Sequence, residues 1–247
     1  MVRPFHVRLL GYAVPVISVR RARRPVALPC LVFCLLACVP ATVRGQQPLP
    51  PVAAQAPLPA SIPLFPLQET TLFPHASRPL LIFEPRYRAM IADALKGDRI
   101  IGMVRLRPGF EADYEGRPPI DAIGCAGRIT EFELLPDGRY AIVLQGVTRF
   151  RVLSEDASRA YRLARVEAVS DTAAPGDAEA LGSARERLVA LLSVVGIDVG
   201  QTSAGDDQVV DTLAQYLEMA SARRQQLLEM NGSLRRARAL IDFVSAK

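Results

Sequence analysis

Between Ile62 and Val169 the chain is a succession of short apolar runs separated by proline and glycine. The runs at 62–67 and 79–83 are bounded by proline, which lacks a backbone N–H and is therefore found at sheet edges or strand ends. Four more runs have the composition of strands: 99–107, 122–135, 139–153 and 161–169. Short strands with so little helix between them indicate a small, closed or strongly curved sheet.

One helix is predicted inside this strand-rich half. It begins at Glu84-Pro85, because proline suits the first helical position and an acidic residue there faces the positive end of the helix dipole. It ends at Gly97. Five apolar residues recur at helical spacing and define one buried face: Tyr87, Met90, Ile91, Ala94 and Leu95.

From Asp177 the pattern becomes helical. Four segments are predicted as helices: 181–196, 206–220, 221–231 and 232–244. Ser221 and Ser233 are natural N-cap residues, and Asn231-Gly232 is a stop signal between the last two helices. We expect these helices to pack together as a C-terminal helical bundle.

The N-terminal 45 residues have the sections of an export signal. A basic stretch, RRARRP at 20–25, precedes an apolar stretch, VALPCLVFCLLACV at 26–39, and small residues follow. Extended to Val43 at most, the apolar run is about 18 residues long and contains Pro29 and Pro40, whereas a spanning helix needs roughly 20 apolar residues. A removed signal peptide is therefore favoured over a permanent anchor. The sequence Leu35-Leu36-Ala37-Cys38 also resembles a bacterial lipobox, in which Cys38 would be lipidated.

Residues 46–60, QQPLPPVAAQAPLPA, carry no charge and predict an extended linker. If the leader is genuine, we expect an exported protein, periplasmic or membrane-tethered, whose contact with the membrane is confined to the leader. If the first 45 residues come from a misassigned start, the protein is cytoplasmic instead.

The distribution of charge argues against a nucleic-acid partner. The formal net charge is +5, but seven of the 30 Lys and Arg residues, and no acidic residue, lie before Gln46. From Gln46 onward, 25 acidic residues face 23 basic ones. Binding to phosphate backbones depends on clustered positive charge, so the folded part is not expected to bind nucleic acid.

Several motifs in order closely resemble the N-terminal substrate-binding domain of Lon proteases, and more closely the free-standing bacterial proteins that consist of that domain. They are LFPLQETTLFP, PLLIFEPRYRAMI, IIGMV, IGCAGRI, PDGRYAIVLQGVTRFRV and YRLARVE. The resemblance implies an α+β fold, with a β-rich, PUA-like pseudo-barrel at 61–172 and a helical subdomain at 177–247. One departure concerns the turn after Leu72-Phe73-Pro74, where His75 stands in place of the family's usual Gly.

The resemblance also implies a non-catalytic module that binds unfolded or exposed apolar polypeptide segments, as an adaptor or holdase associated with proteolysis. A protease or a chaperone is a further expected partner. The residues expected to contact the peptide are five apolar and two basic ones: Phe65, Leu67, Leu72, Phe73, Phe83, Arg86 and Arg88. Each of the apolar five is also a candidate for the core.

The sequence offers little catalytic chemistry. Neither lysine, Lys96 or Lys247, is followed by Ser or Thr, so there is no phosphate-binding G-x-x-x-x-G-K-[ST] loop. The separate domain that supplies the Ser-Lys pair of Lon proteolysis is absent from the resemblance. We expect no catalytic residue, metal or cofactor. Two alternatives stay open: a hydrolase with an unrecognised site that uses Cys125 and His75, and an RNA-binding pseudo-barrel.

Overall fold

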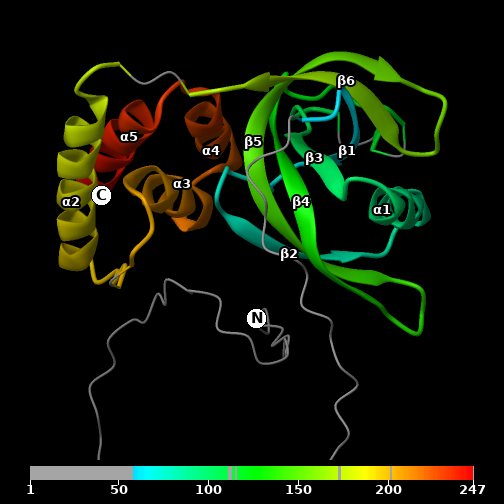
Figure 1. The fold of residues 1–247 in the computed structure, drawn as a ribbon, viewed down its shortest axis with the longest axis horizontal. Helices are drawn as coiled ribbons and strands as arrows, with labels where there is room; N and C mark the ends of the chain where they lie inside the picture. Colours follow the sequence, from blue (N-terminus) through cyan, green and yellow to red (C-terminus); the bar gives the residue numbers. More distant parts are fainter. Residues whose placement is uncertain (1–57, 111–112, 115, 172–173, 201, 247) are drawn as a thin grey trace, which may run out of the picture.

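The structure is a computed structural model that describes residues 58–110, 113–114, 116–171, 174–200 and 202–246. The proposed leader, most of the linker and Cys38 lie outside these residues. The described part contains six strands and five helices (Figure 1). The strands are β1 (Ser61–Leu67), β2 (Ser77–Ile82), β3 (Ile100–Arg105), β4 (Ile123–Leu134), β5 (Tyr140–Asp156) and β6 (Arg162–Val169). The helices are α1 (Pro85–Lys96), α2 (Asp177–Val194), α3 (Asp206–Tyr216), α4 (Ser221–Glu229) and α5 (Ser233–Ser245).

The six strands form one mixed sheet that closes on itself. Its strand order is β2-β5-β4-β3-β1-β6, and β6 also pairs with β5. β1 and β3 are parallel, and every other pair is antiparallel. The 17-residue strand β5 is long enough to pair with β2, β4 and β6 along its length. The expected closed or strongly curved sheet is therefore present, with β2 attached outside the ring.

The two proline-bounded strands behave differently. β2 lies at an end of the strand order, as proline predicts, but β1 lies between β3 and β6. The prolines of β1 are accommodated because its halves have different partners. Ser61–Leu64 pair with β6, and Leu64–Leu67 pair with β3. Along most of its length β1 therefore has one neighbour only, which leaves a side where a missing N–H costs no ladder hydrogen bond.

Helix α1 confirms the predicted amphipathic segment, with Pro85 in its first turn and Gly97 directly after it. Its face buries Tyr87, Met90 and Ile91 in the main core. The ring of Tyr87 meets that of Phe65 edge to face, with centroids 4.7 Å apart. This aromatic contact anchors the start of α1 against β1.

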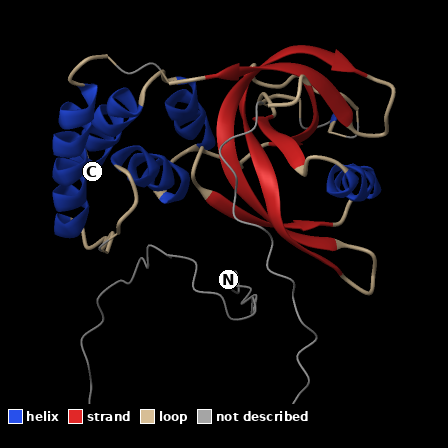
Figure 2. Ribbon diagram, in the orientation of Figure 1, coloured by secondary structure: helices blue, strands red, loops and turns tan. Residues whose placement is uncertain are grey.

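Four helices follow the sheet, as predicted, and lie to one side of it (Figure 2). α2 contacts α5 and α3, and α3 also contacts α5. The N-cap predictions were wrong: the caps are Ala220 and Gly232, without side-chain hydrogen bonds, and Ser221 and Ser233 are the first helical residues. The Ser233 hydroxyl instead accepts a hydrogen bond from Arg236 at 2.9 Å.

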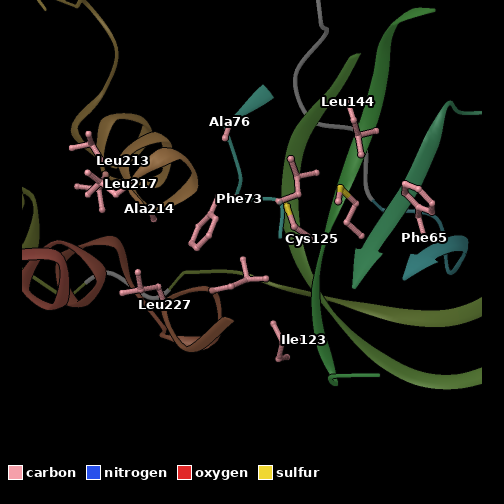
Figure 3. Packing of buried hydrophobic residues seen from close by; sticks show 14 of the residues in the cluster. Phe65, Phe73, Ala76, Ile123, Cys125, Leu144, Leu213, Ala214, Leu217 and Leu227 are labelled. Carbon is pink, nitrogen blue, oxygen red and sulfur yellow. The ribbon is translucent and has the colours of Figure 1, made fainter. Parts of the chain in front are cut away.

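The largest apolar cluster runs from the sheet into the helices without interruption. Phe73, just before β2, lies between the strands and three leucines of the helical half, Leu213, Leu217 and Leu227 (Figure 3). The backbone N–H of Phe73 donates to Gln215 Oε1 at 3.0 Å, so α3 is tied to this segment by a hydrogen bond as well. The strand-rich and helical halves therefore share one core.

A buried polar network also joins the two halves. Arg149 of β5 donates to the carbonyl oxygens of Leu228 (3.0 Å) and Met230 (2.9 Å), and pairs with Asp171. Arg236 of α5 pairs with Asp171 at 2.6 Å and with Asp211 of α3 at 2.8 Å. Each of the two arginines places a buried positive charge between the two halves, and its carboxylate and carbonyl partners compensate that charge. None of the described helices is long and apolar enough to cross a membrane.

Candidate functional site

Strand β2 presents an open edge. It pairs with β5 through a regular register, from Ser77 opposite Gln145 to Ile82 opposite Tyr140, and has no second strand neighbour among the described residues. Pro79 cannot donate a ladder hydrogen bond, so the pair that it forms with Val143 is of the non-hydrogen-bonded kind. The antiparallel pattern alternates, and the backbone groups of Leu81 consequently point away from β5, toward the open side.

The contact made by Ser77 agrees with this assignment. Its backbone carbonyl accepts a hydrogen bond from the Tyr216 hydroxyl of α3, from outside the sheet. The open edge is thus covered by α3 at its beginning. Farther along, from Pro79 to Phe83, no backbone–backbone bond on that side is found among the described residues.

Exposed apolar side chains follow the same edge. Pro79, Leu81 and Phe83 are spaced by two, which places them on one side of an extended chain. Leu81 is 48% exposed and Phe83 is 62% exposed. The intervening Ile82 is buried in the main core. We call Pro79 and Leu81, with their outward backbone groups, together with Phe83 directly after the strand, the β2 edge.

Two more exposed apolar residues lie at the end of the neighbouring β4–β5 hairpin. Phe132 and Leu134 of β4 are both exposed, and they face Ile142 and Tyr140 of β5, which in turn pair with β2. The hairpin projects past the rest of the sheet in Figure 1. Because directly paired residues lie on the same face of a sheet, Phe132 and Leu134 are on the face of Leu80 and Ile82, opposite to that of Leu81.

The structure separates the residues expected to contact peptide into two groups. Phe65, Leu72 and Phe73 are buried in the main core, and Leu67 packs against it. Their side chains serve packing and present little or no surface to a ligand. Phe83 is the exposed member of the apolar five.

Arg86 and Arg88 are both partly buried, in different surroundings. Arg86 Nε donates to Glu84 Oε2 at 3.0 Å, and its guanidinium lies over the ring of Tyr114, 4.9 Å from the centroid. Arg88 instead lies beside Gly138 in the β4–β5 turn, where its guanidinium occupies the space that a Cβ on Gly138 would need. The two arginines therefore belong to separate sites, the α1 N-terminus and the hairpin turn.

The residues of the hydrolase alternative do not form a catalytic pair. Cys125 is fully buried in β4, and burial raises the pKa of its thiol, which keeps the thiol protonated and a poor nucleophile. His75 Nε2 instead lies 3.6 Å from Asp207 Oδ2, at the rim of a pocket of about 430 Å³ between the sheet and the helices. Within the part of the chain that the structure describes, no three His, Cys, Asp or Glu side chains gather in a way that could hold a metal.

The turn at His75 explains the departure from the family pattern. His75 has a positive φ of 63°, the left-handed region that favours glycine. Its N–H donates to the carbonyl of Gly146 at 3.0 Å, and its carbonyl accepts from Gln145 Nε2 at 2.8 Å. The turn therefore keeps a glycine-like conformation although a histidine occupies it.

Comparison with known proteins identifies the family. Residues 61–246 match the family model described as the ATP-dependent protease La (LON) substrate-binding domain. The chain belongs to this family. The matched region runs through both the strand-rich half and the helical half.

Relatives and solved structures agree with this assignment. The Lon protease of Anaeromyxobacter dehalogenans is 26% identical over 199 residues, which are 77% of this chain and 24% of that protein. The chain thus matches about a quarter of the length of this relative. Its fold is similar to the N-terminal domain of the Mycobacterium avium complex Lon protease, with a TM-score of 0.58 at 21% identity, covering 75% of this chain and 98% of that one. A Lon N-terminal domain protein from Xanthomonas campestris gives a TM-score of 0.52 at 23% identity, covering 74% and 98%.

Proposed function

We propose that this chain is a non-catalytic recognition module that binds exposed apolar segments of other polypeptides, and that such a segment adds as a strand to the β2 edge. Membership in the LON substrate-binding family supports the general role. The observation that carries the specific site is that the open edge of β2 lies beside two exposed apolar side chains, Leu81 within the strand and Phe83 directly after it.

Strand addition suits this edge for a physical reason. Backbone hydrogen bonds to a sheet edge provide affinity for any extended segment, and alternate side chains provide preference. At the β2 edge the side chains that flank the open backbone are apolar, so a segment with apolar residues at alternate positions gains most. An exposed apolar edge is a liability that proteins usually avoid, and its presence here favours a binding role.

In this proposal the chain acts as an adaptor or holdase, with a protease or chaperone as the next partner. The location follows from the leader. A processed protein with a start near residues 41–46, or lipidated at Cys38, would work at the cell envelope. An unprocessed protein would work in the cytoplasm. The intact mass and N-terminus of the protein from fractionated native cells distinguish the two.

Peptide binding is tested with the full chain and a fluorescein-labelled peptide of alternating Val and Ser, followed by fluorescence anisotropy. A second peptide carries N-methyl groups on the backbone nitrogens that would pair with β2. We expect the unmodified peptide to bind and the N-methylated one to bind at least about tenfold more weakly, because each lost backbone bond costs about 1 kcal/mol.

Matched variants locate the site. Phe83→Ser removes apolar surface from the β2 edge, whereas Val194→Ser removes an 85%-exposed valine from α2. Phe83→Ser should weaken the binding of the unmodified peptide, and Val194→Ser should leave that binding unchanged. Equal binding of both peptides, or equal effects of the two variants, would show that the β2 edge is not the site.

A further inference from the structure

A second pocket, of about 260 Å³, lies at the N-terminus of α1, beside the ends of the parallel strands β1 and β3. Its polar lining consists of three arginines and three tyrosines: Arg86, Arg117, Arg162, Tyr87, Tyr114 and Tyr161. No described Asp or Glu lines it. The charged groups among its described lining residues are therefore guanidiniums.

Two of the arginines are balanced by carboxylates behind the pocket. Arg86 pairs with Glu84 at 3.0 Å and donates to the carbonyl of Tyr114 at 3.3 Å. Arg162 pairs with Glu155 at 3.4 Å and donates to the carbonyl of Pro118 at 2.5 Å. These contacts fix both side chains, since an arginine held by two oxygen acceptors has little rotational freedom.

The third arginine, Arg117, donates to the carbonyl oxygens of Asp156 and Arg159, at 3.2 and 3.3 Å. It has no carboxylate within ion-pair distance among the described residues. The Asp156 carboxylate acts on Arg117 from beyond that distance, so the charge of Arg117 is less closely compensated than those of Arg86 and Arg162. The guanidinium groups also repel one another. Burial lowers the pKa of Arg162, and Glu155 opposes this shift. The positive charges of Arg117 and Arg86 lower the pKa of Arg162 further.

We propose that this pocket binds a carboxylate of the polypeptide ligand, either its C-terminus or an acidic side chain. The inference rests on the proposed function, because it names a second point at which the same ligand is held. A pocket with two ion-paired arginines and one loosely compensated arginine matches a singly charged carboxylate better than a phosphate dianion. Planar guanidiniums supply pairs of N–H donors that fit the two oxygens of a carboxylate.

The aromatic residues suit this role. Arg86 lies over the rings of Tyr87 and Tyr114, 4.7 and 4.9 Å from their centroids, and is held in place between them. Tyr161 donates its hydroxyl to Asp93 at 2.9 Å, which keeps that carboxylate engaged outside the pocket lining. A carboxylate that enters meets a preorganised site, so little of the binding free energy is lost in ordering it.

The experiment uses the full chain and two apolar peptides of one sequence, one ending in a carboxylate and the other in a carboxamide. The carboxylate form should bind about tenfold more tightly, as expected for one charge-assisted interaction. A second amidated pair, with Glu or Gln at its last position, separates side-chain from C-terminal recognition. In Arg117→Gln the ratio of the affinities for the carboxylate and carboxamide peptides should fall toward one. The affinity for the carboxamide peptide should not change. Arg238→Gln, an exposed arginine on α5, is the control and should keep the preference.

The outcomes separate this inference from the proposed function. If both forms of each pair bind equally well, the carboxylate site is refuted while apolar recognition stands. If no peptide binds, the proposed function fails, and this inference with it. If inorganic phosphate displaces the carboxylate peptide and acetate at equal ionic strength does not, the pocket selects phosphate and the assignment to a carboxylate is overturned.

Discussion

The α-carbon of Gly146 lies so close to Phe73 that a Cβ on Gly146 would stand 2.8 Å from the Phe73 carbonyl carbon and overlap its oxygen. This approach lets the segment before β2 cross β5. Its hydrogen bonds are His75 N–H to the Gly146 carbonyl and Gly146 N–H to the Ala76 carbonyl, at 3.0 and 2.8 Å.

Gly146→Ala should therefore destabilise the protein by about 3 kcal/mol, because two backbone segments must separate to admit the methyl group. Urea denaturation measures the change. Gly182→Ala provides a control of opposite sign. Gly182 lies within α2, and the added Cβ would meet only the end of the Asp206 side chain, at 3.3 Å. It should gain about 0.5–1 kcal/mol from helix propensity. Equal stability of Gly146→Ala and the wild type would mean that the close approach is not maintained in solution.

The positive φ of His75 gives a second prediction. Asparagine tolerates this region and a β-branched residue does not. His75→Asn should stay within about 0.5 kcal/mol of the wild type, whereas His75→Val should lose about 1–2 kcal/mol. Thermal unfolding of the two variants side by side gives the comparison. The reverse order would contradict a left-handed backbone at this turn.

Gln215 makes a third prediction about the joint between α3 and the sheet. It is buried, accepts from Phe73 N–H at 3.0 Å, and donates to the Thr71 carbonyl at 2.9 Å. Gln215→Leu fills a similar volume but leaves both backbone groups unsatisfied, which should cost about 2–4 kcal/mol. Gln208→Leu, at an exposed position of the same helix, should change the free energy of unfolding by less than about 0.5 kcal/mol. A small loss of stability in Gln215→Leu would contradict this prediction, because it would mean that water bonds to the Phe73 and Thr71 backbone groups in place of the amide.

Asp211 gives a pH dependence. Burial raises its pKa to about 7, although the paired Arg236 opposes the shift. Between pH 4 and 7 the unfolded chain releases this proton while the folded protein retains it, so the contribution of Asp211 to stability falls as pH rises and levels off above 7. The loss is on the order of 2–4 kcal/mol across that window.

Asp211→Asn removes this titration and leaves Arg236 paired with Asp171. Its stability relative to the wild type should rise steadily from pH 4 to pH 7 in urea titrations. Asp242→Asn, an exposed residue of α5, should follow the wild-type profile. Parallel profiles for Asp211→Asn and the wild type would show that Asp211 is ionised throughout.

The order of elements could be predicted from the sequence because each boundary carries a local signal. Pro85 starts α1, Gly97 follows its end, and Pro136-Asp137-Gly138 turns β4 into β5. Proline also predicted the open edge of β2 correctly. It suggested an edge position for β1 as well, where the strand in fact has a different neighbour along each half.

The residues that form the β2 edge and the arginine pocket could not be predicted in the same way. Leu81 looks like a core residue in an apolar run, and only the structure shows that its side chain lies on the exposed face of β2. Arg117 and Arg162 are far apart in sequence from Arg86, and nothing local indicates that they share a pocket. Ser221 and Ser233 matched an N-cap signal, but the helices begin one residue earlier than that signal requires, and Ser233 serves the Arg236 network instead.

The closure of the sheet also constrains how the protein can be made. β1 needs β6 as a partner, and about 100 residues separate the two strands along the chain. Contacts of such long range form slowly, because the intervening chain must be ordered first. During synthesis the ring cannot close until β6 has left the ribosome, and the helices that cover Phe73 emerge later still. The nascent chain therefore exposes its own apolar segments for much of its synthesis, and a chaperone that holds them during that interval would serve this protein in the way that we propose it serves others.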